Sequence, residues 1–314
     1  MILITGSTGY IGSHISDFFD KKKINYIGVD NHSYSYKKNV RNKKKHLKVD
    51  ISNIEIIRKI IKRYKINLII HTAASSYVID GEKNKKKYFL NNIKKTKKFI
   101  DLCKYENLEN FIFLSSSNVY NEKNIFNEND KTKSKNFYGK NKITIENYLK
   151  KKNFNNLIIL RLFNVIGFYN KLFKPFKFKE KNYQRILFQI QERLKNNRPI
   201  KLRYYKKNKK KIFPSRDFVD IKILFLVIKK IIDEVANKNV GTKVLNVGSG
   251  IATPIDKIIK TLEKLINKKI KTQYELINIK ELISTKANIS KLKKFLKKDI
   301  KFNLKNTLNS YINY

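Results

Sequence analysis

The feature that most constrains this chain is a turn with three glycines near its start, Thr5-Gly6-Ser7-Thr8-Gly9-Tyr10-Ile11-Gly12. Gly6 allows a tight turn, Gly9 lets the backbone approach a ligand closely, and Gly12 permits close packing of a helix on a strand. The G-x-x-G-x-x-G spacing alone is a weak signal. Its position between an apolar run and a predicted helix makes it a pyrophosphate-binding turn, because a helix N-terminus offers free N–H groups to anions.

Apolar and helical segments alternate up to about residue 165. The predicted strands are Ile2–Thr5, Tyr26–Asp30, His46–Val49, Leu68–His71, Phe111–Leu114 and Leu157–Leu162. The predicted helices between them are Ile11–Phe19, Ile54–Tyr64, Tyr88–Lys104 and Tyr138–Leu149. Strands that alternate with helices pair in parallel through right-handed crossovers, and strands buried on both faces are apolar throughout. We therefore predict an α/β fold, a Rossmann-type doubly wound parallel sheet.

After Gly167 the pattern becomes less regular. We predict a loop over 168–181, then a helix over 183–196, a strand at Ile200–Tyr205, an unassigned segment at Phe213–Ile221, a helix at Lys222–Val235, a strand at Val244–Val247 and a helix at Pro254–Ile266. This region is expected to form a smaller interleaved α/β substrate lobe from residues 167–216 and 250–314. Residues 1–166, together with about 217–249, are expected to form the larger domain, which carries the glycine turn.

The cofactor prediction depends on Asp30, which ends the second predicted strand 18 residues after Gly12. A carboxylate at this place accepts hydrogen bonds from the adenosine ribose and repels a 2′-phosphate, so NAD is favoured over NADP. The alternative is a solvated turn aspartate. Asp50 ends the third strand in a similar way, and Asp50-Ile51 are expected to flank the adenine.

Tyr138 and Lys142 lie four residues apart at the start of a predicted helix, so their side chains share a face. Ser116 ends the strand Phe111–Leu114 and its serine extension, at the sheet edge where ligands of such folds bind. A phenol ordinarily ionises near pH 10, so Tyr138 can act as a base only where positive charge from Lys142 and the nicotinamide favours the phenolate. The alternative is a packed tyrosine with a neighbouring lysine whose stem covers apolar surface.

The net charge of +46 raises the question of nucleic-acid binding. Only nine of the 71 basic residues are arginine, whereas base and phosphate recognition usually relies on the arginine fork. The lysine runs, such as Lys21–Lys23 and Lys85–Lys87, are scattered along the chain. We interpret the charge as solvated surface that attracts anionic substrates, and we do not expect a nucleic-acid partner.

Other features are consistent with a cytoplasmic enzyme that has no metal. The first residues already form a predicted strand, so we expect no leader segment, and no apolar run is long enough to cross a membrane. Cys103 has no disulfide partner, because it is the only cysteine. The histidines His14, His32, His46 and His71 lack the spacing of metal ligands.

Taken together, these motifs resemble the extended short-chain dehydrogenase/reductase family, in its NAD-dependent epimerase/dehydratase branch typified by UDP-glucose 4-epimerase. The resemblance covers nearly the whole chain. The similar blocks are Thr5–His14 (TGSTGYIGSH), Val29–Asn31, Val49–Ile51, His71–Ala74 (HTAA), Asn91–Ile93, Phe113–Tyr120 (FLSSSNVY), Phe137–Lys142 (FYGKNK), Leu160–Gly167 (LRLFNVIG), Arg216–Val219 (RDFV), Leu245–Gly250 (LNVGSG) and Ala287–Leu292 (ANISKL).

The resemblance implies a catalytic set, a cofactor set and a substrate set. The implied catalytic residues are Ser116, Tyr138 and Lys142. Besides the three glycines, Tyr138 and Lys142, the implied NAD contacts are Tyr10, Ile11, Asp30, Asn31, Asp50, Ile51, Ala73, Ala74, Asn92 and Phe163. Besides Ser116 and Tyr138, the implied nucleotide-sugar contacts are Asn164, Asn182 and Arg216. Relatives form homodimers through helices like Tyr88–Lys104 and Tyr138–Leu149, so a homodimer is expected.

Departures from the family pattern leave the reaction and the sugar open. Dehydratases carry an acid at the position of Asn118, so its absence argues against water elimination. Lys95 replaces a typical glycine, and Ser76 stands where UDP-glucose 4-epimerase has a lysine. We expect an epimerase that acts at C4 of a UDP-hexose. The alternatives are a nucleotide-sugar dehydrogenase or reductase, which would turn over NAD(H) stoichiometrically, and a non-catalytic redox sensor, which would not need Ser116, Tyr138 and Lys142. Steep salt-dependent duplex binding would instead indicate a nucleic-acid binder.

Overall fold

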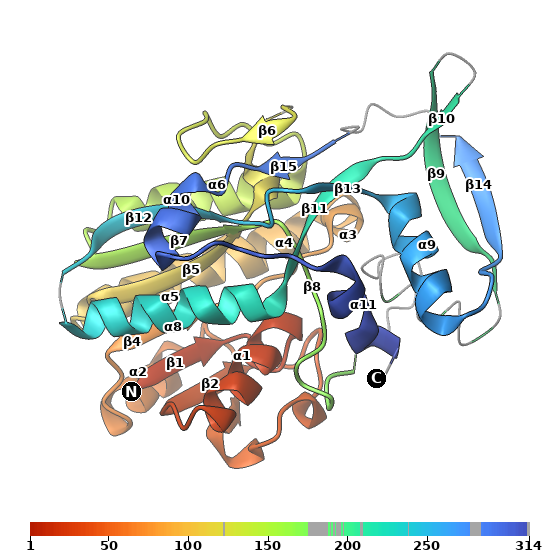
Figure 1. The fold of residues 1–314 in the computed structure, drawn as a ribbon. Helices are drawn as coiled ribbons and strands as arrows, with labels where there is room; N and C mark the ends of the chain where they lie inside the picture. Colours follow the sequence, from red (N-terminus) through yellow and green to blue (C-terminus); the bar gives the residue numbers. More distant parts are fainter. Residues whose placement is uncertain are drawn as a thin grey trace.

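Seven parallel strands form the central sheet of the computed structural model (Figure 1). The structure describes residues 1–121, 123–174, 198–207, 210–237, 239–276 and 284–312, together with the single residues 188, 190, 192 and 196. The strand order is β12-β7-β5-β4-β1-β2-β3. The strands are β1 (Ile2–Thr5), β2 (Tyr26–Asp30), β3 (His46–Lys48), β4 (Leu68–His71), β5 (Asn110–Ser116), β7 (Asn156–Leu162) and β12 (Gly241–Val247). The predicted doubly wound parallel sheet is therefore confirmed.

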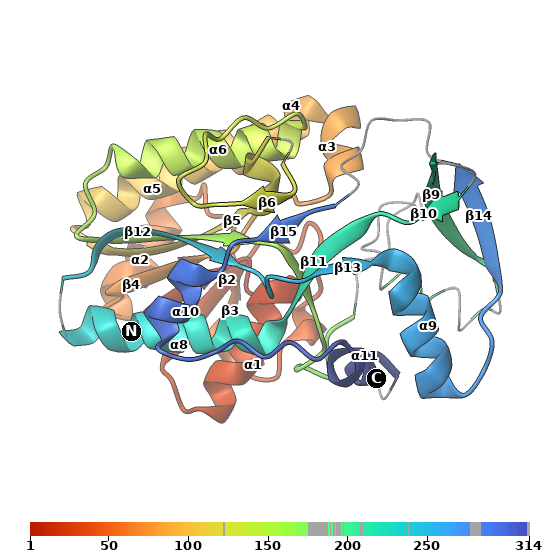
Figure 2. The ribbon, with the colours of Figure 1, turned by 45° about the horizontal axis from the view of Figure 1, so that its top comes forward.

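Both faces of this sheet are buried because successive strand residues enter two separate apolar layers. Ile2 and Ile4 pack with α1 (Tyr10–Lys21) and α8 (Ile221–Asn237), whereas Leu3 between them faces the opposite layer. That layer contains α2 (Ile54–Arg63), α5 (Lys95–Tyr105) and α6 (Phe137–Lys150). Figure 2 shows the sheet between α5 and α6 on one side and α1 and α8 on the other.

The predicted helix Tyr88–Lys104 consists of three successive pieces. They are α4 (Lys85–Tyr88), a π-helical segment (Phe89–Lys94) and α5. A further short helix, α3 (Val78–Lys83), precedes them and was not predicted. The wider turn of a π-helix often occurs at functional sites. Here it carries Asn91 and Asn92, both of which bind Ser75 in the loop after β4.

A second, smaller sheet lies beyond the carboxyl ends of the central strands, on the right of Figure 1. Its strands are β9 (Ile200–Lys207), β10 (Lys210–Ile212) and β14 (Thr272–Leu276), in the order β10-β9-β14. The helix α9 (Ile255–Ile266) lies beside it, as Figure 2 also shows. The predicted strand Ile200–Tyr205 and helix Pro254–Ile266 are thus present. The predicted helix over 183–196 falls largely outside the described residues.

Short strands join the two parts of the molecule. The segment Phe213–Ile221, which the sequence left unassigned, contains the whole of β11 (Ser215–Asp220). This strand pairs in parallel with β8 (Asn164–Ile166) and antiparallel with β13 (Ala252–Pro254). A two-stranded sheet pairs β6 (Ile125–Phe126) with β15 (Lys286–Ala287), and the chain continues into α10 (Ser290–Leu296) and α11 (Leu304–Ile312).

A buried ion pair fixes α6 against the sheet. The Glu146 carboxylate accepts hydrogen bonds from Arg161 at 2.8 Å and 3.1 Å, and both side chains are at most 3% exposed. Ser115 lies opposite Arg161 in the β5–β7 register and donates a further hydrogen bond to Glu146. Because two strands hold one helix by charge-assisted hydrogen bonds, the rotation and height of α6 are fixed.

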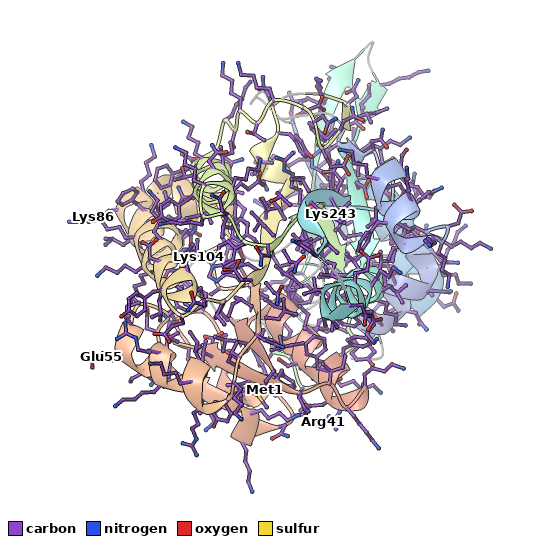
Figure 3. The ribbon with its side chains drawn as sticks, turned by 90° about the vertical axis from the view of Figure 1, so that its left-hand side faces the viewer. Met1, Arg41, Glu55, Lys86, Lys104 and Lys243 are labelled. Carbon is purple, nitrogen blue, oxygen red and sulfur yellow. The ribbon has the colours of Figure 1, made fainter. Side chains whose placement is uncertain are left out.

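The lysine side chains are spread over several elements. Figure 3 labels Lys86 on α4, Lys104 on α5 and Lys243 on β12, and basic side chains project on every visible side of the molecule. Among the described residues, no helix combines the length and apolar character needed to cross a membrane.

We expect Glu146→Ala to lower the free energy of unfolding by about 3–5 kcal/mol, because it leaves the Arg161 charge buried without its partner. The matched control is Asp233→Ala, which removes the half-exposed Lys229–Asp233 pair on α8 and should cost less than about 1 kcal/mol. Urea denaturation of the three proteins measures both changes. Equal costs for the two variants would contradict the role assigned to the buried pair.

Candidate active site

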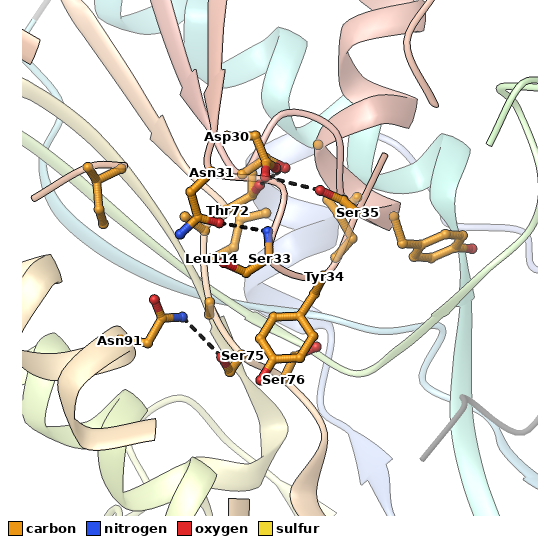
Figure 4. A pocket seen from close by; sticks show the side chains of 18 of the residues that line it. Asp30, Asn31, Ser33, Tyr34, Ser35, Thr72, Ser75, Ser76, Asn91 and Leu114 are labelled. Atoms are coloured by element: carbon orange, nitrogen blue, oxygen red, sulfur yellow. Dashed lines mark hydrogen bonds between the residues drawn. The ribbon is translucent and has the colours of Figure 1, made fainter. Parts of the chain in front are cut away.

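A pocket lies at the carboxyl ends of β1, β2, β4 and β5, where ligands bind in folds of this kind. Its walls come from the glycine turn after β1, the loops after β2 and β4, the end of β5 and the start of α6. Figure 4 shows side chains from the two loops, including Asp30, Ser35 and Ser75, directed toward one space.

The glycine turn has no room for side chains. Gly6 has a φ of +67°, and an added Cβ there would lie 2.7 Å from the Ala73 backbone. A Cβ at Gly12 would lie 2.2 Å from the Gly6 carbonyl oxygen. Gly9 precedes α1, and no side chain caps the helix and no acidic residue occupies its first turn. The N-terminal turn of α1 therefore lines the pocket beside a bare backbone, which fits a pyrophosphate.

Asp30 lines the pocket at the end of β2 and is held in place by its own loop. Its carboxylate accepts hydrogen bonds from the backbone N–H of Thr8 at 3.1 Å and of His32 at 2.7 Å. The Ser35 hydroxyl donates a third hydrogen bond to it at 3.0 Å. Asn31, the next residue, lines the same pocket.

Asp50 stands behind the pocket wall, whereas its neighbour Ile51 lines the pocket. Burial alone would raise the pKa of Asp50, but hydrogen bonds from Lys95, Ser52 and Asn31 hold that pKa well below its usual range. The unexpected Lys95 thus forms an ion pair with Asp50. This carboxylate fixes Asn31 at the pocket edge.

Tyr138 and Lys142 line the pocket from the first turns of α6. The Lys142 ammonium is buried, donates a hydrogen bond to the Leu114 carbonyl at 2.7 Å, and lies 5.8 Å from the centre of the Tyr138 ring. Burial lowers the pKa of Lys142 to about 7, against the opposing effect of the Glu146 carboxylate. The tyrosine hydroxyl and the lysine charge thus belong to one site.

His71, at the end of β4, contributes structure and no charge. Its ring is hydrogen-bonded to Thr5 and stacks on Phe99 and Phe113. Burial, together with the nearby charge of Lys142, lowers the pKa of His71 to about 3. Within the described ranges, no group of three His, Cys, Asp or Glu residues could hold a metal ion.

Ser116 lies at the end of β5 just outside the pocket lining, whereas Ser115 belongs to the lining. The Ser116 hydroxyl accepts hydrogen bonds from the backbone and the side chain of Asn118 at 3.2 Å and 3.1 Å. Asn118 in turn accepts a hydrogen bond from Asn136, the N-cap of α6. The position of Ser116 is therefore tied to the start of the helix that carries Tyr138.

The remaining predicted residues lie in three places. Tyr10, Ile11, Ala73 and Ala74 line the pocket. Asn92 does not line it and instead braces the loop after β4 through two hydrogen bonds to the Ser75 backbone. The third group lies toward the smaller sheet. Phe163 is buried with Tyr120 and Phe126. Asn164 on β8 donates a hydrogen bond to the Asp217 carbonyl, and Arg216 lies on β11, the strand paired with β8. Asn182 is outside the described residues.

Several pocket residues were not predicted, and many of them are polar. Those in the loops after β2 and β4 and in the π-helical segment are Ser33, Tyr34, Ser35, Thr72, Ser75, Ser76, Tyr77 and Asn91. All but Asn91 directly follow β2 or β4, so their position after a strand end was the signal that could have identified them. Asn91 depends on the π-helical segment, for which the sequence holds no periodic signal.

The chain is similar to known proteins in sequence and in fold. A sequence model of the NAD dependent epimerase/dehydratase family matches residues 2–248. The UDP-glucuronate 4-epimerase of Thermodesulfobacterium geofontis is 26% identical over 340 residues, which cover 99% of this chain and 95% of that protein. Bifunctional protein GAL10 of Kluyveromyces lactis is 31% identical over 182 residues, or 52% of this chain. The match spans only about a quarter of that longer relative, 26% of its length.

The fold also matches a crystal structure of UDP-glucose-4-epimerase from Stenotrophomonas maltophila, which contains NAD and formylated UDP-arabinopyranose. The TM-score is 0.89 at 17% identity, with 99% of this chain and 96% of the other covered. At this identity the likeness establishes the shared fold.

The burial of Lys142 predicts a pH-dependent stability. Because its folded pKa lies near 7 and its ordinary value is 10.5, the unfolded chain binds one more proton between these pH values. The free energy of unfolding of the wild type should therefore increase relative to that of Lys142→Met as the pH rises above 7. The increase should be at most about 1.4 kcal/mol per pH unit. Urea denaturation between pH 7 and 9.5 measures it, with Lys140→Met at an exposed position of α6 as control. A flat difference would contradict the prediction.

Proposed function

The chain belongs to the NAD dependent epimerase/dehydratase family, and on this premise we propose that it is a nucleotide-sugar epimerase that inverts C4 of a UDP-hexose through a 4-keto intermediate. One observation carries the proposal. Tyr138 and Lys142 line the same pocket as the glycine turn and Asp30, so an acid–base group and a dinucleotide site are combined. A binding protein without catalysis would not require this combination.

The proposed reaction gives each residue a defined task. Bound NAD supplies the hydride acceptor and donor, and Asp30 and the glycine turn would hold its adenosine ribose and pyrophosphate. Tyr138 accepts the proton of the sugar 4-hydroxyl. After the 4-keto sugar has rotated within the pocket, Tyr138 returns the proton to its oxygen. Lys142 stabilises the phenolate by its charge, and Ser116 orients the hydroxyl through a hydrogen bond.

The nucleotide part of the substrate is assigned to the boundary with the smaller sheet. Arg216 and Asn164 stand on the paired strands β11 and β8, and an arginine can bind phosphate oxygens in a bidentate manner. We assign binding of the diphosphate to these two residues. Asn182 is assigned to the same pocket by resemblance alone. The UDP-sugar named for the Stenotrophomonas protein and the name of the Thermodesulfobacterium relative support a UDP-linked substrate.

The environment of Asn118 supports epimerisation over water elimination. Its amide donates to Ser116 and accepts from Asn136, so a neutral, hydrogen-bonded side chain fills the position where dehydratases carry an acid. Elimination needs a proton donor for the leaving hydroxyl, and an amide cannot serve as one.

Three further parts of the proposal concern the whole protein. We assign NAD binding to residues 1–166 with about 217–249, and nucleotide-sugar binding to 167–216 and 250–314. The strand β12 supports this division, because residues 241–247 complete the central sheet. A homodimer and a cytoplasmic location complete the proposal.

Replacing the proposed base should remove activity and leave cofactor binding intact. We expect Tyr138→Phe to lower kcat for UDP-hexose epimerisation by at least about 100-fold, because general acid–base catalysis is lost. The matched control is Tyr148→Phe on the same helix, whose hydroxyl binds Asp101 outside the pocket. NMR of UDP-glucose and UDP-glucuronate with catalytic NAD measures turnover. Undiminished turnover in Tyr138→Phe would disprove the mechanism, and stoichiometric NADH formation would indicate a dehydrogenase.

Asp30 should set the preference for NAD over NADP. We expect Asp30→Asn to weaken NAD binding by about tenfold, because the carboxylate charge is lost. For the same reason, the difference in affinity between NAD and NADP should become smaller. Calorimetric titration of both dinucleotides measures the two dissociation constants. Asp101→Asn, an exposed acid on α5, is the control. An unchanged NAD/NADP ratio would show that Asp30 does not contact the ribose.

A further inference from the structure

We propose that Tyr34 and Lys87 form a clasp across the cofactor pocket that slows release of the dinucleotide. The inference rests on the proposed function, because an epimerase reuses the hydride it has removed and therefore benefits from retaining its cofactor between half-reactions. The observation that carries it is a contact between Tyr34, which lines the pocket, and Lys87 on α4, which follows the loop after β4. The Lys87 ammonium lies 4.6 Å from the centre of the Tyr34 ring.

The first wall is the loop after β2, which presents Tyr34. Asp30 and Ser35 fix this loop, since Ser35 is hydrogen-bonded to Asp30 on one side and to Thr8 of the glycine turn, at 2.6 Å, on the other. His32 adopts a left-handed conformation, with a φ of +59°, and its N–H is held by Asp30. Because the loop is braced at both ends, the direction of the Tyr34 side chain is set.

The second wall is the loop after β4, and the helices α3 and α4 follow this loop outside the pocket lining. Tyr88 on α4 binds both the N–H and the carbonyl of Tyr77, at 3.1 Å and 2.8 Å, so helix and loop form one braced unit. Ser76 and Tyr77 of this wall line the pocket. Figure 4 shows the Tyr34 ring directed from the first wall toward Ser75 and Ser76 of the second.

The contact is suited to a clasp because one partner is rigid and the other can move. Tyr34 is half-buried in the pocket wall, whereas Lys87 is exposed and belongs to the run Lys85–Lys87 on α4. An ammonium over a tyrosine ring contributes about 0.5–2 kcal/mol, depending on its exposure to water. The same ammonium adds positive charge beside a pocket meant for an anionic pyrophosphate, so both effects oppose release.

The test is the rate at which bound NADH leaves the protein, measured by the fall in its fluorescence after mixing with excess NAD. We expect Lys87→Met and Tyr34→Leu each to speed release by about 2- to 30-fold, the range that a cation–π contact allows. The double variant should release no faster than the faster single variant, because both changes remove one contact. Tyr34→Phe keeps the ring and should release NADH at nearly the wild-type rate.

Lys86→Met is the matched control, because Lys86 is exposed on the same short helix. Release rates that stay within twofold of wild type in Lys87→Met, or accelerations that multiply in the double variant, would overturn the clasp. Should Tyr34→Leu fail to fold, Lys87→Met and Tyr34→Phe still decide the question. Wild-type protein that binds no NADH at all would instead refute the proposed function.

Discussion

The Glu146–Arg161 ion pair determines where the chemistry of this protein can occur. Both groups are buried, and their charges are tolerable only because they meet with good geometry, because Ser115 donates a hydrogen bond to Glu146, and because Arg161 donates one to the Tyr120 hydroxyl. The pair connects the middle of α6 to β5 and β7. Lys142 lies one turn earlier on the same helix, and Tyr138 lies one turn earlier again. The ion pair therefore sets the distance between the tyrosine, the lysine and the strand ends, and it stands outside the pocket that it organises.

In the pocket, too, buried side chains support the residues that line the ligand space. The parallel strands bring the glycine turn, Asp30 and the loop after β4 to one edge of the sheet. Buried side chains such as His71 and Asn92 hold these loops from behind and carry no charge toward the ligand space. Asp50 and Lys95 provide a paired charge at one end of the pocket, so the ion pair fixes Asn31 without leaving a net charge there. The residues in direct reach of a ligand are mostly small or backbone groups.

The sequence predicted the central sheet well because buried parallel strands are apolar throughout, and all seven strands of this sheet are among the eight that were predicted. It also predicted which residues of the glycine turn, of β2 and of α6 would share a pocket. It could not distinguish Ser115 from Ser116 as the pocket-lining serine, since adjacent strand residues alternate sides and a run of serines gives no apolar pattern to fix the faces. The short strands β8, β11 and β13 were missed because their pairing partners are distant in the chain. The π-helical segment was missed because it depends on contacts of Asn91 and Asn92 with a loop.

The strand β12 has a consequence for how the protein can be made on the ribosome. It covers the outer edge of β7 along its full length, from Gly241 opposite Asn156 to Val247 opposite Leu162. All of the described smaller sheet except β14 is encoded between these two strands. During synthesis β7 therefore emerges long before β12, and the backbone N–H and C=O groups on its outer edge, away from β5, remain unpaired while the intervening residues are added. An apolar strand with an open edge is a template for pairing with other chains, so nascent protein is at greatest risk of aggregation in this interval, and completion of β12 ends it.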